Sequence, residues 1–485
     1  MKKWLPLIGL LALLMGIGCS RSFDKASEDS ALQPTFSVDT LRVDTLYSRL
    51  SSATHRLIVY NRHEKAIELQ KVLLDEKGSP HFRLNVDGRS GQSFSNLFIP
   101  PHDSLFLFVE ATFPEGEDDL PTRYEAKLLF HCRGVVSKVL LEGIRLNIDH
   151  CKALSIDRDS TLLGNRPLLI RDSIIVHEGA TLTLEAGTHL LLGDKAKIVV
   201  YGSLLAKGTP QNRILIEGIR RDELVEKVNY RLLPGQWENI QLLGAQKKHI
   251  LRYTTIRNGR GGIIVGKKKE ALPIHLELEG CILTNMKGSA LQATNAEIEA
   301  TNSLLSNTMA PSLKLSGGNC LLQYCTIAGF YPFDRRQGAS IDLSPTPQGS
   351  EPSLVLSNSV VEGTFTVSRT NNKKPIGGEI FFDNSKPQWI SLSSCYVRSP
   401  LELYTQIDNC IEAKLKPDSV FVALGKNKKT KEYTFIYNFK PYSDAPFATQ
   451  KKSDTAPLYD LEGNERHKTT AWGAYEAIER EREEH

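Results

Sequence analysis

Long apolar runs, metal-binding cysteine spacings and clustered acids are scarce in this 485-residue sequence. The apolar run from Trp4 to Met15 is shorter than the roughly 20 residues that a membrane-spanning helix needs. The eight cysteines form no Cys-x-x-Cys spacing of the kind that holds zinc, so we expect no structural metal and no other cofactor. A net charge of +4 is too small to predict a nucleic-acid partner.

Sequence motifs of polysaccharide-cleaving enzymes are also missing. Such enzymes use clustered carboxylates as acid and base, but the single Asp-Asp pair, Asp118-Asp119, lies outside the repeats described below. No His is followed by Gly, and the one Arg-x-Lys, Arg466-His467-Lys468, lies near the C-terminus. A repetitive fold can still bring distant residues together. A lyase or hydrolase therefore stays an alternative, and it predicts at least three acids converging with an Arg or Lys in one groove.

The second half of the chain is organised around a short pattern that returns six times. An aliphatic residue or Ala is followed three places on by a small residue, and two places later by an aliphatic. Internal repeats spaced about 20–50 residues apart indicate a solenoid. The six copies are Leu251-x-x-Thr254-x-Ile256, Leu278-x-x-Cys281-x-Leu283, Ala300-x-x-Ser303-x-Leu305, Leu322-x-x-Cys325-x-Ile327, Leu356-x-x-Ser359-x-Val361 and Leu392-x-x-Cys395-x-Val397.

The repeat cores are runs of a few residues with period-2 alternation, which is typical of strands rather than helices. Asn and Gly residues that tolerate left-handed backbone angles separate them, so we expect tight turns. About three short strands and three turns per repeat predict one coil of a parallel β-helix. The small and aliphatic positions then form two interior columns, with the cysteines as buried filler. The turn residues concerned are Asn258, Asn285, Asn307, Gly329 and Gly363.

The N-terminus has the features of an export signal. Lys2-Lys3 precede the apolar run, which ends in Gly16-Ile17-Gly18-Cys19, as in a secretory signal peptide. This ending resembles a bacterial lipobox, which implies lipid attachment to Cys19. An ordinary signal peptide with an incidental cysteine is the alternative. We predict a signal peptide over 1–18 and a polar tether over 19–35, similar to that of Bacteroidetes-type lipoproteins.

Residues 36–148 are predicted to form a β-sandwich. Strand-like segments recur every 8–15 residues over this region, which is typical of an antiparallel sandwich. The segment Arg56–Asn61 followed by Ile67–Leu69 resembles Ig-like modules. Cys132 and Cys151 lie near its end, and the sequence leaves open whether they form a disulfide. The predicted strands are Leu41–Tyr47, Arg56–Tyr60, Ile67–Leu74, Phe82–Val86, Ser95–Ile99, Ser104–Glu110, Tyr124–His131 and Val136–Leu146.

The rest of the chain resembles a known superfamily of secreted proteins. Pro234–Ile240 followed by Ile250–Asn258 is similar to a rung of pectate-lyase-like proteins, and Asp460–Arg466 followed by Gly473–Glu476 resembles their C-terminal ending. The resemblance implies a right-handed parallel β-helix over 155–410, C-terminal strands and an end cap over 411–477, and a tail over 478–485. The predicted fold class is all-β, an N-terminal Ig-like β-sandwich followed by a right-handed parallel β-helix.

These features together predict a non-catalytic, lipid-anchored outer-membrane protein, on the periplasmic face or the cell surface. It would bind or scaffold a membrane-protein partner or a polysaccharide, because this fold serves many functions and the sequence shows no catalytic grouping. A host-surface adhesin is a further alternative. Projecting loops rich in aromatic and basic residues are the expected contacts. They include the insert 220–231 and the candidate contact residues Tyr331, Phe333, Arg335, Arg336, Lys267, Lys268 and Lys269.

Overall fold

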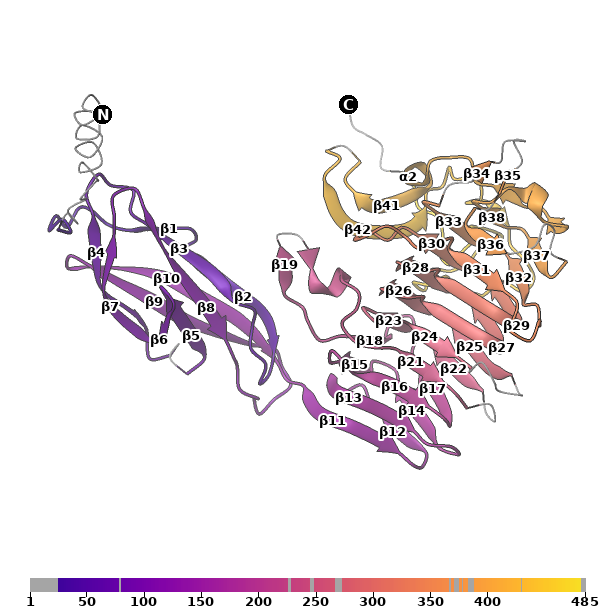
Figure 1. Cartoon of the computed structure of the whole chain (residues 1–485), viewed down its shortest axis with the longest axis horizontal. Helices are drawn as coiled ribbons and strands as arrows, with labels where there is room; N and C mark the ends of the chain where they lie inside the picture. The colour runs from indigo at the N-terminus through magenta and orange to yellow at the C-terminus, as the bar shows by residue number, and fades with distance from the viewer. Residues whose placement is uncertain are drawn as a thin grey trace, which may run out of the picture. The chain divides into compact units, whose positions relative to one another are not determined.

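Figure 1 shows a computed structural model of the chain, which is built almost wholly from strands. The chain divides into two compact units, Met1–Asn147 and Ile148–His485. No helix in the part of the chain that the structure describes is long and apolar enough to cross a membrane. The described residues are 25–77, 80–225, 228–244, 248–266, 273–365, 368–369, 375–376, 378–382, 388–428 and 430–480.

The first unit consists of two five-stranded sheets whose apolar side chains share one buried cluster. All eight predicted strands are confirmed within two residues, because their buried and exposed residues alternate with period 2. One sheet has the order β1 (Thr35–Phe36), β3 (His55–Tyr60), β8 (Ser104–Ala111), β5 (Phe82–Val86) and β6 (Arg89–Gly91). The other has the order β2 (Thr40–Tyr47), β10 (Val135–Leu146), β9 (Thr122–Cys132), β4 (Ile67–Leu74) and β7 (Ser93–Ile99).

The described part of the predicted tether packs on this unit instead of standing free. The backbone N–H of Ser27 donates to the carbonyl of Ala66 (2.8 Å), and Arg133 Nε donates to the carbonyl of Ser27 (2.8 Å). Leu32 packs against the buried cluster. These contacts hold residues 25–35 to the folded unit; Cys19 and the signal peptide lie outside the described residues. Cys132 and Cys151 are both free thiols.

The second unit contains one 26-stranded sheet, mostly parallel, which is compatible with a β-helix. Its strands form three ladders that the chain visits in the same order, turn after turn; we call one such turn a rung. Ladder A contains β12 (Ser160–Leu162), β14 (Thr181–Glu185), β17 (Ser203–Lys207), β22 (His249–Arg252), β25 (Ile274–Glu279), β27 (Leu291–Thr301), β29 (Leu313–Gln323), β32 (Ser353–Ser357), β37 (Ile390–Ser393) and β39 (Gln406–Asp408).

Ladder B begins with β11 and β13 and forms the second face. Its strands are β11 (Asp149–Ile156), β13 (Leu168–Val176), β15 (His189–Leu192), β18 (Ile214–Gly218), β23 (Thr254–Arg257), β26 (Ile282–Met286), β28 (Leu304–Thr308), β30 (Thr326–Gly329), β33 (Val360–Gly363), β38 (Tyr396–Val397) and β40 (Ile411–Glu412). Ladder C joins the later parts of β11 and β13 to β16 (Lys197–Val200), β21 (Ile240–Leu242), β24 (Ile263–Val265), the first parts of β27 and β29, β31 (Ile341–Ser344) and β36 (Ile380–Phe382).

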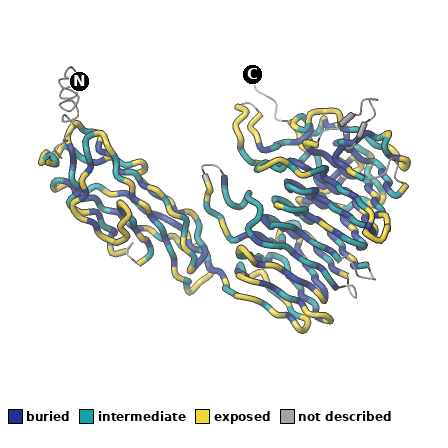
Figure 2. The backbone as a smooth tube through the Cα atoms, viewed as in Figure 1, coloured by how far each residue is buried: buried dark blue, intermediate teal, exposed yellow. Residues whose placement is uncertain are grey.

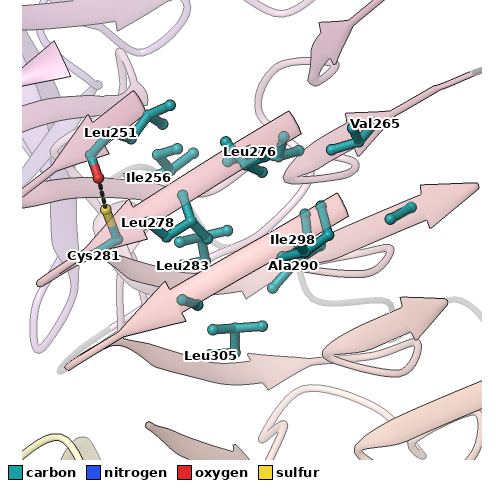
Figure 3. Close-up of a cluster of buried hydrophobic side chains, with 14 of the residues drawn as sticks. Leu251, Ile256, Val265, Leu276, Leu278, Cys281, Leu283, Ala290, Ile298 and Leu305 are labelled. Atoms are coloured by element: carbon teal, nitrogen blue, oxygen red, sulfur yellow. Dashed lines mark hydrogen bonds between the residues drawn. The ribbon is translucent and has the colours of Figure 1, made fainter. Parts of the chain in front are cut away.

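The two predicted interior columns are confirmed. The six aliphatic positions, from Ile256 to Val397, are paired in register along ladder B. The six small positions, from Thr254 to Cys395, are fully buried. Figure 3 shows this interior, where the Cys281 thiol donates to the carbonyl of Leu251 (3.2 Å). The pattern also continues one rung further than predicted, to Cys410, whose thiol donates to the carbonyl two residues before it.

Each small residue follows a residue with a left-handed backbone, which turns the chain from ladder A into ladder B. The sequence prediction missed this corner because two of its members, Tyr253 and Tyr324, are bulky side chains that rarely adopt positive φ. The corner residues are Tyr253, Gly280, Asn302, Tyr324, Asn358, Ser394 and Asn409, with φ between 41° and 60°.

Among the turn residues that were predicted, the asparagines are confirmed and two glycines have a different role. Asn258, Asn285 and Asn307 have φ of 71°, 56° and 51°. Gly329 and Gly363 do not have positive φ and lie in register at the ends of β30 and β33. A Cβ added at either would lie 2.4 Å or 2.2 Å from a buried charged side chain, so these positions need glycine for space.

The C-terminal segment lies along the outer face of ladder B, whereas the sequence predicted a cap over the end of the coil. Apolar side chains point outward from ladder B, among them Leu304, Val360 and Tyr396, and they form a second core with the segment. Burying this apolar stripe is the physical reason for the difference. The segment contains α2 (Pro417–Val420), β41 (Phe421–Lys426), β42 (Tyr433–Pro441), β43 (Gln450–Lys451) and β44 (Thr469–Thr470).

The remaining short elements lie in projections from the rungs. The insert predicted over 220–231 forms β19 (Glu223–Val225) and β20 (Val228–Asn229), which pair as a hairpin, followed by η1 (Tyr230–Leu232). Figure 1 shows this insert and the β41–β42 hairpin both projecting from the ladders. Later projections carry β34 (Ser368–Arg369), β35 (Pro375–Ile376) and η2 (Leu401–Leu403).

Candidate binding groove on ladder B

The groove has a polar floor that two neighbouring rungs supply. Thr284 and Ser306 are paired in register on β26 and β28, and their hydroxyl oxygens lie 2.9 Å apart. Asn285 and Asn307 follow them with left-handed backbone angles, one residue before these strands end. Short hydroxyl and amide side chains therefore occupy the middle of ladder B. At the positions of Thr284 and Ser306, the neighbouring rungs carry Arg257 and Ala328.

Aromatic side chains from separate segments form the walls. The groove has a volume of about 220 Å³. Its walls come from η1, the loop after β30, the β41–β42 hairpin and the C-terminal segment. The residues that line it are Leu232, Ile282, Thr284, Asn285, Leu304, Ser306, Asn307, Pro332, Phe333, Phe435, Tyr437, Phe439 and Tyr475.

Four aromatic rings at the edge of the groove are in sequential contact. Phe333 and Phe435 are stacked, with ring centroids 5.6 Å apart and an interplanar angle of 7°. Tyr331 lies edge-on to Phe333 (5.9 Å), and Tyr433 stacks on Phe435 (5.8 Å). Tyr433 is 58% exposed, and Figure 2 shows that the tip of its hairpin faces solvent. Phe435 has a φ of 55°, which is strained for an aromatic residue.

Asn307 leaves one polar atom of the floor without a partner. The residue is 3% exposed, and its Oδ1 is buried with no hydrogen-bond partner among the described residues. Burying an unpaired acceptor costs roughly 1–3 kcal/mol. Because this oxygen has almost no accessible surface, the cost is internal to the fold and a ligand in the groove does not contact it.

A buried carboxylate, Glu217, lies two rungs from the floor with several basic groups around it. Glu217 accepts from His189 Nε2 (2.9 Å) and Arg257 Nε (2.6 Å), and Arg231 and Arg221 lie 3.5 Å and 3.6 Å away. Burial opposes the charge on Glu217, but the hydrogen bond from His189 and the charges of Arg257 and Arg231 hold its pKa well below the ordinary value. This cluster fixes the base of the 220–231 insert to the rung beneath it.

Two more buried carboxylates lie beyond the other side of the floor. Glu379 accepts from Arg336 at 2.8 Å and 2.9 Å, and neither side chain is more than 6% exposed. Glu362 pairs with Arg398; burial raises the pKa of Glu362, against the opposing charge of Arg398. No group of three His, Cys, Asp or Glu side chains that could hold a metal occurs among the residues whose structure is described.

The structure separates the predicted contact residues. Tyr331 and Phe333 lie together at the groove edge, and Arg335 is exposed. Arg336 belongs to the buried ion pair with Glu379, so its guanidinium is not available at the surface as the sequence interpretation required. Its neighbours in sequence do not reveal this, because Glu379 is 43 residues away. Lys267, Lys268 and Lys269 lie outside the described residues.

Sequence reasoning missed the residues that complete the groove. Tyr433, Phe435, Tyr437 and Phe439 alternate along β42, a period-2 aromatic pattern that is visible in the sequence. That pattern predicts one aromatic face on a strand. The polar floor carried no such signal, because Thr, Ser and Asn are also the usual residues of turns.

Comparisons with known proteins leave the family open. No protein-family model and no curated protein matches the chain. A solved family 123 glycoside hydrolase from Clostridium perfringens, described in connection with glycolipid glycan hydrolysis, matches at 9% identity with a TM-score of 0.18, covering 25% of this chain and 26% of that one. BcpA, the major pilin subunit of Bacillus cereus, matches at 12% identity with a TM-score of 0.15, covering 26% of this chain and 44% of that one. These likenesses are too slight to support a functional argument.

Proposed function

We propose that the chain is a binding module that holds a glycan in the groove on ladder B. The observation that carries the proposal is the convergence of aromatic side chains on a floor of hydroxyl and amide side chains in one groove. A sugar ring has apolar C–H faces and a border of hydroxyl groups. Aromatic faces cover the former, and hydroxyl and amide groups pair with the latter.

The dimensions favour a short part of a longer chain. The groove, at about 220 Å³, is smaller than the roughly 300–1,000 Å³ of pockets that enclose a whole small-molecule ligand. It fits one or two sugar units of a polysaccharide whose remaining units lie over exposed Tyr433 and half-buried Tyr331. Binding of this kind needs no catalytic group.

The proposed setting is the outer membrane. The lipobox-like ending at Cys19 supports a lipid anchor, with the Ig-like first unit as a spacer and the second unit as a right-handed, pectate-lyase-like β-helix. The large parallel sheet of the second unit is consistent with that assignment. A lipid-anchored module on the periplasmic face or the cell surface would meet polysaccharides directly.

A glycan array probed with the purified full chain tests the proposal. We expect one glycan class to bind, and Phe333→Ala to weaken binding at least tenfold, because it removes a ring that lines the groove and supports Phe435 by stacking on it. Phe381→Ala is the matched control: Phe381 is 47% exposed on β36 of ladder C, away from the groove. An array without any bound glycan, or equal losses in both variants, would contradict the proposal.

Two alternative functions, a scaffold for a protein partner and a polysaccharide-cleaving enzyme, predict different experimental results. Recovery of a stoichiometric integral membrane protein with the lipidated chain, insensitive to Phe333→Ala, would favour a scaffold for a protein partner. Cleavage of the bound glycan during prolonged incubation would favour a lyase or hydrolase.

A further inference from the structure

The small-residue column ends in two neighbouring cysteines. From Cys281 onward, cysteine and serine alternate along the column until the last two rungs, where Cys395 is followed directly by Cys410. The order is Cys281, Ser303, Cys325, Ser359, Cys395 and Cys410. Serine therefore separates each earlier pair of sulfur atoms, and the terminal pair has no such separation.

The register places these two residues side by side. Tyr396 pairs with Ile411 in the parallel ladder, and the N–H of Ile411 donates to the carbonyl of Cys395 (2.8 Å). In-register residues on adjacent strands have Cα atoms about 4.8 Å apart, within the roughly 4.4–6.8 Å that a disulfide spans. Cys281 and Cys325 are two rungs apart, at about 10 Å, which is too far for a disulfide.

The two thiols differ in access. Cys395 is fully buried, whereas Cys410 is partly exposed. Both are free thiols in this structure. The hydrogen bond with Cys395 lowers the pKa of Cys410, which favours the thiolate form of the more accessible sulfur. The exposed member of the pair is thus the nucleophile, and the buried member is positioned to react second.

The pair joins the last rung to the rung before it. β39 and β40 pair with β37 and β38, and no described strand pairs with their other edge. All three residues of β39 are exposed, and Ile407 is 45% exposed. The C-terminal segment packs on the outer face of ladder B, on the rungs from β26 to β40. The final edge of ladder A is exposed, so we expect it to fray.

We propose that Cys395 and Cys410 are a thiol–disulfide site that locks the terminal rung. The Cys410 thiolate attacks a disulfide of an oxidising thiol–disulfide partner, releasing one thiolate and forming a mixed disulfide. Cys395 Sγ, after losing its proton, attacks the Cys410 sulfur and releases the second thiolate. The protein loses two protons and two electrons, and the partner disulfide takes them up and becomes a dithiol.

Oxidation of the full chain with oxidised glutathione tests this site. We expect a cross-linked peptide containing Cys395 and Cys410, while Cys281 and Cys325 are recovered as free thiols after unfolding and alkylation. Amide exchange over residues 406–412 should slow at least tenfold upon oxidation, and dithiothreitol should reverse the change.

Two variants keep the result interpretable. Cys410→Ser retains the side-chain size found elsewhere in this column and should abolish both the cross-link and the change in exchange. Cys151→Ser removes the other partly exposed thiol of this unit and should leave both unchanged. Recovery of Cys395 and Cys410 as unlinked peptides after oxidation, or a cross-link that leaves exchange over 406–412 unaltered, would overturn the proposal.

Discussion

Single residues determine how the rungs turn and what they can enclose. The columns of the interior could be predicted because small and aliphatic residues recur at fixed offsets. The left-handed corner at Tyr253 and Tyr324 could not be predicted, because the position of these residues in the rung overrides their intrinsic preference for negative φ. Gly329 and Gly363 resemble ordinary turn residues in the sequence. Their real constraint, the space taken by Arg336 and Glu379, depends on a long-range contact.

Gly363→Ala tests that constraint. The new Cβ would lie 2.2 Å from Glu379 Oε1, so the buried ion pair must shift. We expect the free energy of unfolding to fall by about 2 kcal/mol. Urea unfolding measures it, with Gly261→Ala as the control, because a Cβ there would meet its nearest neighbour at 3.6 Å. Equal stability of the two variants would show that the Arg336–Glu379 ion pair shifts without a cost in free energy, and would contradict this constraint.

Glu217→Gln tests the cluster beneath the insert. The substitution leaves the partly buried Arg257 without its charge partner, and we expect a loss of about 3–5 kcal/mol. Since the folded pKa of Glu217 is depressed, its contribution is fully present above the unfolded value of about 4.3 and declines as pH falls below it. The difference between wild type and variant should therefore shrink in acid.

Urea unfolding between pH 3 and 7 measures this dependence. Glu277→Gln is the control, because the Glu277 side chain is 32% exposed and lies 3.7 Å from Arg252. A pH-independent difference for Glu217→Gln would contradict the assignment of a stabilising charge.

At the scale of elements, the C-terminal segment is the main departure from the sequence prediction. The motif around Asp460 and Arg466 was predicted to belong to the C-terminal end of the fold, but its place on the flank of ladder B was not predicted. Arg466 donates to Asn302 at a corner of the rungs and to the carbonyl of Gly473, both within 3.0 Å. The motif therefore fastens the segment to the flank of ladder B. The only sequence features that indicate this position are the outward-facing apolar residues of ladder B, such as Leu304. Which way these side chains face cannot be predicted until the register of the strands is known.

Arg466→Met tests how the segment is held. The variant leaves several buried carbonyl groups without a donor, so we expect the segment to loosen with a loss of about 3 kcal/mol or more. Arg480→Met is the control, because Arg480 pairs with Asp444 at the surface and such pairs contribute at most about 1 kcal/mol. Limited proteolysis should cut 443–478 faster in the first variant alone. Equal cutting would show that apolar packing holds the segment by itself.

At the scale of the whole molecule, strands and turns could be predicted well and the groove only in part. Tyr331 and Phe333 were identified from composition. Their partners Phe435 and Thr284 come from segments distant in sequence, which the repeats and the hairpin bring together. The proposed function rests on that convergence.

Hydrogen–deuterium exchange with and without the glycan selected by the array tests directly whether the groove binds it. We expect slower exchange upon binding in 282–286, 304–308, 330–336 and 433–439, the segments that form the groove. Residues 274–279 of ladder A should be unaffected. Protection confined to the first unit or to ladder A, with none in these four segments, would contradict a glycan site on ladder B.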